Sequence, residues 1–129
     1  MYFDQKLERV SIGNETFPIK IDMYVLEKIQ EEYGTLNEFE LKVKGLVKNG
    51  EVDAEGNTIY DRVEPSVKEM NFVLPIMVRE GCEIEGIELD MTDREMIRNS
   101  NVSYIDLNKI IVKEFDQCFK TRKKESPSK

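Results

Sequence analysis

Alternating apolar and polar positions near the start of the chain predict a β-hairpin. Apolar side chains occupy every second position from Phe17 to Ile21, and a shorter apolar run precedes Gly13-Asn14. This dipeptide tolerates the positive φ angles of a tight turn. Pro18 falls on the opposite face, where its missing N–H suits an edge strand. Because two strands alone are marginally stable, we expect the hairpin to pack on helices.

The next apolar positions recur with helical spacing and predict two helices in succession. Asp22 is suited to cap the first helix, and Gly34 is suited to end it. Thr35 precedes Glu38 with the spacing of a capping box, so a second helix is expected at once. Asn49-Gly50 is expected to close this helix, which gives an αα-hairpin. The predicted apolar positions of the second helix are Leu36, Phe39, Val43, Leu46 and Val47.

Residues 51–65 carry little periodic signal. Glu55-Gly56-Asn57 lies there between Val52 and Ile59-Tyr60, which predicts either a small hairpin or an ordered loop. The sequence alone leaves both alternatives open.

The third predicted helix is apolar on nearly all sides, a pattern typical of the most buried helix in a fold. It is expected to begin after Ser66, which has capping-box spacing to Glu69. Pro75 is expected to kink or locally unwind the helix, and Gly81 is expected to end it. Residues 82–90 are acidic and irregular.

Two further helices complete the prediction. Thr92-Asp93-Arg94-Glu95 matches a capping box and predicts a short fourth helix through Ile97. The last helix has the most regular apolar stripe, made of Leu107, Ile110, Ile111, Phe115, Cys118 and Phe119. The expected fold is therefore α+β and mostly α. It is a single helical domain of about five helices over residues 1–120, with the N-terminal hairpin packed on one side, followed by a disordered basic tail over residues 121–129.

Composition removes several kinds of chemistry from consideration. The 129 residues include no histidine, which excludes Ser-His-Asp catalysis and zinc sites with histidine ligands. Cys82 and Cys118 are too few for a disulfide framework and are expected to be reduced thiols in a cytoplasm. No apolar run is long enough for a transmembrane helix, and Met1-Tyr2-Phe3-Asp4 does not resemble the start of a signal peptide. We therefore expect a cytoplasmic location.

Charge is distributed unevenly along the chain. Residues 120–129 carry five basic side chains and one acidic side chain, whereas the other 119 residues carry 14 basic and 25 acidic side chains. This body of net charge −11 would repel a phosphate backbone, so we expect no nucleic-acid partner and no membrane partner.

Two groups of acidic residues have features of an ion-binding or catalytic site. Other features of the sequence argue against both sites. Asp53, Glu55, Asn57, Ile59, Asp61 and Glu64 match the ligand positions of a calcium-binding EF-hand loop. Thr58, however, occupies the position where that loop needs glycine. A second acidic run could hold magnesium or a pair of catalytic carboxylates, but its alternation with apolar residues is typical of a solvated loop. That run comprises Glu80, Glu83, Glu85, Glu88, Asp90, Asp93 and Glu95.

The remaining candidates also favour structural roles. Cys118 lies on an apolar stripe as a core thiol, and the acidic surroundings of Cys82 should raise its pKa. Methionines are suited either to filling the core or to lining an adaptable groove for an apolar segment of another protein. We accordingly predict no catalytic, cofactor-binding or metal-binding residue. The methionines in or near predicted helices are Met23, Met70, Met77, Met91 and Met96.

The order of these features resembles one family. The chain resembles the tail assembly chaperones in the order of four features. These features are the hairpin at residues 12–21, the helix at residues 24–34, Val63-Glu64-Pro65-Ser66-Val67 and the segment at residues 74–81. Long-tailed phages and prophages of Gram-positive bacteria encode these proteins. The resemblance spans roughly residues 7–120 and rests on patterns of common residue types.

The resemblance implies a non-enzymatic function. Such chaperones coat the helical, apolar tape-measure protein before the tail tube polymerises, and they are absent from the finished virion. The implied partners are the tape-measure protein and the tail-tube protein. We also expect that the chain can associate with itself. Exposed apolar residues of the third helix and of the Glu83–Met91 loop are the candidate binding positions. A structural phage tail or virion component is the alternative, and a small metal-dependent or hydrolytic enzyme is a third hypothesis.

Overall fold

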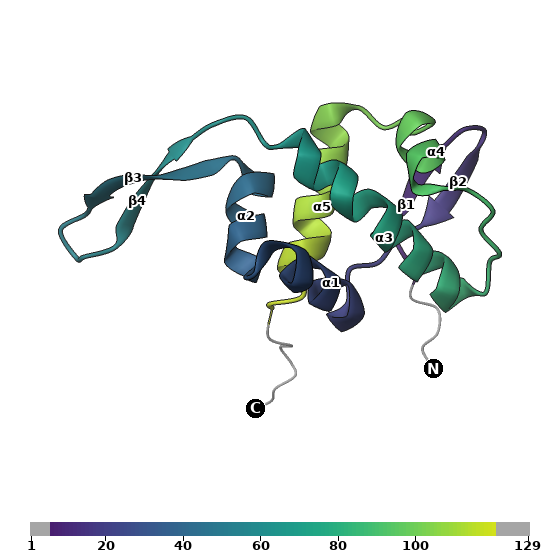
Figure 1. Cartoon of the computed structure of the whole chain (residues 1–129), viewed down its shortest axis with the longest axis horizontal. Helices are drawn as coiled ribbons and strands as arrows, with labels where there is room; N and C mark the ends of the chain where they lie inside the picture. Colours follow the sequence, from purple (N-terminus) through teal and green to yellow (C-terminus); the bar gives the residue numbers. More distant parts are fainter. Residues whose placement is uncertain (1–5, 121–129) are drawn as a thin grey trace.

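The computed structural model describes residues 6–120 and has the expected fold class. Within this range it is an α+β structure, mostly α, with five helices and two separate two-stranded antiparallel sheets (Figure 1). Residues 121–129, predicted to be a disordered tail, lie outside the described range. The elements in chain order are β1 (Arg9–Ile12), β2 (Glu15–Pro18), α1 (Met23–Tyr33), α2 (Leu36–Lys44), β3 (Leu46–Val52), β4 (Thr58–Arg62), α3 (Val67–Glu85), α4 (Asp93–Arg98) and α5 (Tyr104–Gln117).

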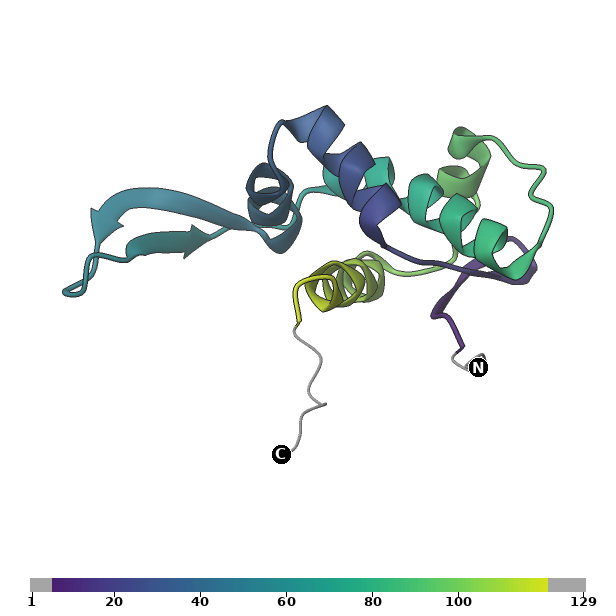
Figure 2. The ribbon, with the colours of Figure 1, turned by 90° about the horizontal axis from the view of Figure 1, so that it is seen from below.

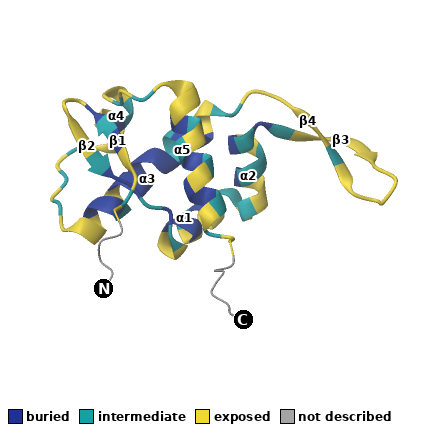
Figure 3. Ribbon diagram, turned by 180° about the vertical axis from the view of Figure 1, so that it is seen from behind, coloured by how far each residue is buried: buried dark blue, intermediate teal, exposed yellow. Residues whose placement is uncertain are grey.

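Helix α3 is the centre of the structure, as its apolar sequence predicts. It contacts β2 and all four other helices, and α5 crosses it at a steep angle (Figures 1 and 2). Figure 3 shows that the buried residues gather along α3 and the helix faces turned toward it. The largest completely enclosed side chains include Phe39, Met70, Leu74, Met77, Met96 and Phe115.

The N-terminal hairpin is confirmed, and it packs on the helices. Strands β1 and β2 pair with Ile12 opposite Glu15 around a turn in which Gly13 has φ 63°. The Gly13 N–H donates to the Asn99 carbonyl at 2.9 Å, which ties the turn to the end of α4. These contacts give the two strands the support that an isolated hairpin lacks.

Gly81 does not end the third helix, contrary to the sequence prediction. Helix α3 continues without interruption through Pro75 and Gly81 to Glu85, and Gly86 caps it with φ 72°. Gly81 instead lets β2 approach the helix closely. A Cβ atom at this position would clash with the Pro18 carbonyl and lie 2.7 Å from the Ile19 nitrogen. The glycine is therefore a packing residue between α3 and the N-terminal hairpin.

The second helix ends earlier than predicted. Helix α2 stops at Lys44, and Gly45 caps it in the left-handed region with φ 74°. A Cβ atom on Gly45 would clash with the Val63 carbonyl, so both the backbone conformation and the close approach require glycine. Leu46 and Val47, predicted to be helical, begin β3.

Residues 46–62 form a long hairpin, which decides between the two alternatives left open by the sequence. Strands β3 and β4 pair in antiparallel order from Leu46 opposite Arg62 to Val52 opposite Thr58. Figures 1 and 3 show that this hairpin projects from the helices and that most of its residues are exposed. We call residues 46–62 the arm.

The predicted helix starts are confirmed, but one of the predicted side-chain caps is wrong. Asp22, Thr35 and Thr92 cap α1, α2 and α4, each accepting a hydrogen bond from the backbone N–H three residues later. Ser66 makes no such bond with its side chain. Glu69, its expected capping-box partner, is 2% exposed and lies beside Tyr33 of α1, whose pKa is raised by burial and by that carboxylate. Glu69 thus links α3 to α1.

The apolar stripe of the last helix is confirmed over most of its length. Leu107, Ile111 and Phe115 are buried, and Ile110 and Cys118 are partly buried against the core. Phe119 lies beyond the end of α5 and is 56% exposed, because the helix stops at Gln117. The predicted stripe therefore extends one residue too far.

Candidate functional site: a groove between α1 and α3

An open groove of about 570 Å³ lies between α1 and α3. We call it the α1–α3 groove. Tyr24 and Ile76 supply apolar surface, and charged side chains of both signs accompany them. The groove residues are Tyr24, Lys28, Ile76, Arg79, Glu80 and Glu83.

Helical spacing places these side chains in two facing rows. Tyr24 and Lys28 are four residues apart on α1, and the Lys28 amine lies 5.3 Å from the centre of the Tyr24 ring. On α3, Ile76, Glu80 and Glu83 share one face, because they are four and three residues apart. Ile84 extends this row by i, i+4 spacing from Glu80 and is 52% exposed, the same fraction as Tyr24. Exposed apolar surface thus continues along the α3 side of the groove.

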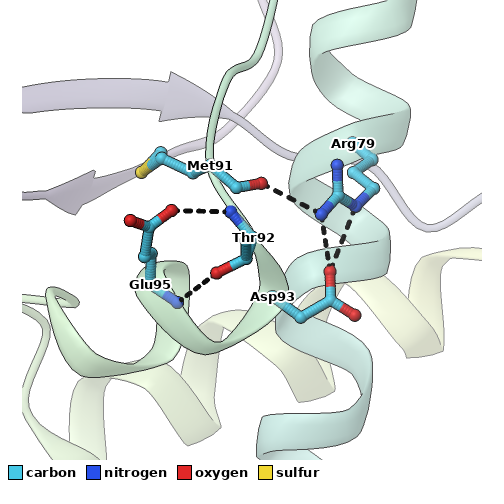
Figure 4. Close-up of polar contacts among 5 residues, drawn as sticks. All are labelled: Arg79, Met91, Thr92, Asp93 and Glu95. Atoms are coloured by element: carbon cyan, nitrogen blue, oxygen red, sulfur yellow. Dashed lines mark hydrogen bonds and ion pairs between the residues drawn. The ribbon is translucent and has the colours of Figure 1, made fainter.

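Arg79 fixes the segment that follows α3 beside the groove. Its guanidinium donates to Asp93 Oδ1 at 2.6 and 3.2 Å and to the Met91 carbonyl at 3.1 Å (Figure 4). Asp93 is the first residue of α4, where Thr92 and Glu95 form the predicted reciprocal capping box (Figure 4). One arginine therefore joins α3, the connecting loop and the start of α4 into one wall.

Two carboxyl groups meet at the end of the groove. Asp22 caps α1, with its Oδ1 accepting from the Val25 N–H at 3.1 Å, and its side chain also hydrogen-bonds Glu80. That hydrogen bond, together with partial burial and the charges of Asp22 and Glu83, raises the pKa of Glu80 to about 7. A protonated Glu80 donates its O–H to the Asp22 carboxylate, which relieves the repulsion of two adjacent negative charges. The sequence showed no such effect.

This carboxyl pair should make stability depend on pH near neutrality. Because the folded-state pKa of Glu80 is raised, its contribution is full below the unfolded value and is lost as pH rises through about 7. Glu80→Gln retains a donor toward Asp22 and does not ionise. We expect the free energy of unfolding of this variant, relative to that of the unmodified protein, to increase by about 1 kcal/mol when the pH is raised from about 5 to about 8. This figure allows for solvent screening. Urea unfolding at both pH values measures the difference.

The matched control for this experiment is Glu88→Gln in the exposed loop after α3. It removes one carboxylate from the same acidic segment without touching Asp22. A constant difference from the unmodified protein at both pH values is expected for the control. The same constant difference for Glu80→Gln would contradict the assignment.

The calcium-loop residues other than Glu64 lie on the arm, and Asp53 is hydrogen-bonded within the turn of the arm. Asp53 accepts hydrogen bonds from the backbone N–H groups of Glu55 and Asn57, both at 2.9 Å, and these bonds lower its pKa. Asp61 lies on β4, and Glu64 follows that strand. Across residues 6–120, no group of three or more acidic or cysteine side chains is placed to hold a metal ion.

The second acidic run is divided among separate structural contacts. Glu80 pairs with Asp22, Glu85 pairs with Arg9 at 3.2 Å, and Asp93 pairs with Arg79. Glu95 belongs to the capping box of α4. The structure does not bring these carboxylates together as one site.

Cysteines and most methionines have the expected structural positions. Cys82 is buried, and burial followed by the charge of Glu85 raises its pKa, in the predicted direction. Burial also raises the pKa of the partly buried Cys118. Met70, Met77 and Met96 fill the core, Met91 is partly buried against it, and Met23 is 79% exposed at the start of α1.

The comparisons with known proteins add no assignment. No protein-family model, curated protein or solved structure matches the chain. Among the helices of residues 6–120, none is both long enough and apolar enough to cross a membrane.

The α1–α3 groove is suited to binding an amphipathic helix. Tyr24 and Ile76 offer apolar contact, while Lys28 and Glu83 present charges of opposite sign to the flanks of a bound helix. Sequence reasoning identified α3 as a candidate binding element but missed the contribution of α1. The exposed Met23-Tyr24 pair directly after the predicted cap was the one available signal.

Proposed function

We propose that this protein is a phage tail assembly chaperone that binds helical segments of a tape-measure protein before the tail tube forms. The observation that carries this proposal is the α1–α3 groove, with apolar surface between charges of both signs. A tape-measure protein is long, helical and apolar, so its unassembled form needs partners that cover apolar helix faces. The order of elements that resembles the chaperone family supports the same function.

Contacts between the elements around the groove also support the proposal. Tyr24 lies on a helix whose cap, Asp22, is bonded to α3 through Glu80, and Arg79 holds the adjoining loop. A preformed surface loses less conformational entropy on binding than a mobile one. Tyr24, on the α1 side of the groove, and Ile84, just beyond its α3 lining, are both exposed and available for apolar contact.

Co-expression with a tape-measure protein from the genome that encodes this chain tests the proposal. We expect the unmodified chain to keep the tape-measure protein in the soluble fraction. Tyr24→Glu combined with Ile84→Glu should abolish this effect, because each change places a charge where an apolar contact is needed. A loss of about 2 kcal/mol at such contacts corresponds to roughly 30-fold weaker binding.

Ile105→Glu is the matched control for this experiment. Ile105 is 62% exposed on α5, away from the groove, so the same type of change should leave solubilisation intact. A tape-measure protein that is equally soluble without the chain would contradict the proposed function. Mass spectrometry of purified particles distinguishes the alternative, because a chaperone is absent from them and a structural tail component is present.

A further inference from the structure

The arm is a two-stranded sheet with both outer edges free. Within the part of the chain that the structure describes, β3 and β4 pair only with each other. Val47, Val52 and Tyr60 are exposed large apolar side chains along the arm. A hairpin of this kind has little stability by itself, and free strand edges readily pair with another strand.

The two edges are not equivalent. Strand β3 carries extra residues between Lys48 and Val52, where its register with β4 shifts. Such a bulge disrupts regular pairing along that edge. Strand β4 runs from Thr58 to Arg62 without an inserted residue, so its edge is the better template for a further strand.

Charges at the two ends of the arm are complementary. The outer part of the arm carries three acidic side chains, those of Glu51, Asp53 and Glu55, all exposed. A groove of about 430 Å³ lies at the base, where Arg62, Lys109 and Lys113 are among its lining residues. Lys44 also lines this groove, but it already pairs with Glu40 at 2.8 Å and Asp116 at 2.9 Å, and Lys113 pairs with Glu8 at 3.6 Å, which leaves Arg62 and Lys109 as the main cationic groups. The base therefore offers cationic groups to an acidic segment.

We propose that two copies of this chain pair antiparallel through the β4 edges of their arms. Pairing centred on Tyr60 places Arg62 of each copy opposite Thr58 of the other. The acidic tip of each arm then reaches the basic groove at the base of the second arm, because five residues of strand span roughly 16 Å. A two-fold axis makes both contacts at once, and the four strands form one antiparallel sheet.

The first test is the molar mass of the full chain, measured by sedimentation equilibrium over a range of concentrations. A reversible dimer is expected, and it should weaken between about 0.1 M and about 1 M salt as the charges are screened. A monomer at every concentration would overturn the proposal. A monomer whose arm binds a strand of another protein would overturn it too.

Paired charge reversals test the contact itself. Glu51→Lys with Glu55→Lys makes the tip basic, and Arg62→Glu with Lys109→Glu makes the base acidic. Each double variant should be monomeric alone, because tip and base then repel. An equimolar mixture should form a heterodimer, because both tip-to-base contacts regain opposite charges. Dimers of either double variant alone, or a mixture that stays monomeric, would overturn the proposal.

Two controls keep the result independent of folding defects. Arg94→Glu with Arg98→Glu, on exposed positions of α4, should leave the dimer intact. In a Cys118→Ser background, Tyr60→Cys should form an intermolecular disulfide under mild oxidation, since residues facing each other across the axis have close Cβ atoms. Val52→Cys, on the other strand, should not. Cross-linking at Val52 but not at Tyr60 would overturn the assignment of the β4 edge.

Discussion

Gly81→Ala is expected to destabilise the protein by about 3 kcal/mol, although alanine is the better helix former. The new methyl group would meet the Pro18 carbonyl and the Ile19 backbone, and neither can rotate away as a flexible side chain would. Relief requires α3 to move off β2. That movement would also strain the hydrogen bond from the Lys20 N–H to the Met77 carbonyl, now 3.1 Å long. Urea unfolding followed by circular dichroism measures the loss.

Gly86→Ala supplies the matched comparison on the same helix. Gly86 has φ 72°, and a Cβ atom there would meet nothing within 4 Å, so the cost is only that of a left-handed backbone, about 1 kcal/mol. The expected order is therefore a larger loss at Gly81 than at Gly86. A Gly81→Ala variant as stable as the unmodified protein would contradict the close approach of β2 and α3.

Phe115→Ala is expected to cost about 4 kcal/mol, the largest loss that we predict for one residue. Its ring is completely buried and lies 5.5 Å from the ring of Phe39, which is buried too. Removing it leaves a cavity where α2, α3 and α5 meet. Thermal or urea unfolding should detect the loss directly.

Phe119→Ala is the control for this cavity. Phe119 is four residues later, and its ring centre lies 5.1 Å from that of Phe115, but the residue is mostly exposed. Removing this ring should cost under about 1 kcal/mol. Equal losses for the two variants would contradict the finding that the core ends at Phe115.

Elements whose signals are local could be predicted from the sequence. Helix α4 has its capping box, α1 has Asp22 and Gly34 at its ends, and the N-terminal hairpin has its turn dipeptide. Each signal works through hydrogen bonds or backbone angles within a few residues. For such elements, neighbours along the chain are sufficient to determine the structure.

Features that depend on close contacts between distant parts of the chain could not be predicted from local patterns. Gly81 matched the local pattern for a helix end, but its function is to admit β2, which lies more than 60 residues earlier. Gly45 was missed because the apolar period continued past it to Val47. In both cases a contact with a distant backbone carbonyl decided the outcome.

The groove follows the same rule. The capping role of Asp22 was predictable, but its hydrogen bond to Glu80 exists only because α1 packs on α3. Likewise, the hydrogen bonds of Arg79 to Asp93 and to the Met91 carbonyl could not be predicted, because they form only when the loop after α3 folds back on this helix. The side chains of the α1–α3 groove come from helices more than 40 residues apart, so no motif in the sequence could reveal the groove.

Hydrogen exchange of the purified complex with a tape-measure segment is the most direct test of the proposed function. We expect slower amide exchange in α1 and in the second half of α3, around Tyr24, Glu80 and Ile84. Tyr24→Glu combined with Ile84→Glu should remove both the binding and the protection, whereas Ile105→Glu should retain them. Protection confined to other elements, or the same protection in the Tyr24 and Ile84 double variant, would contradict the account.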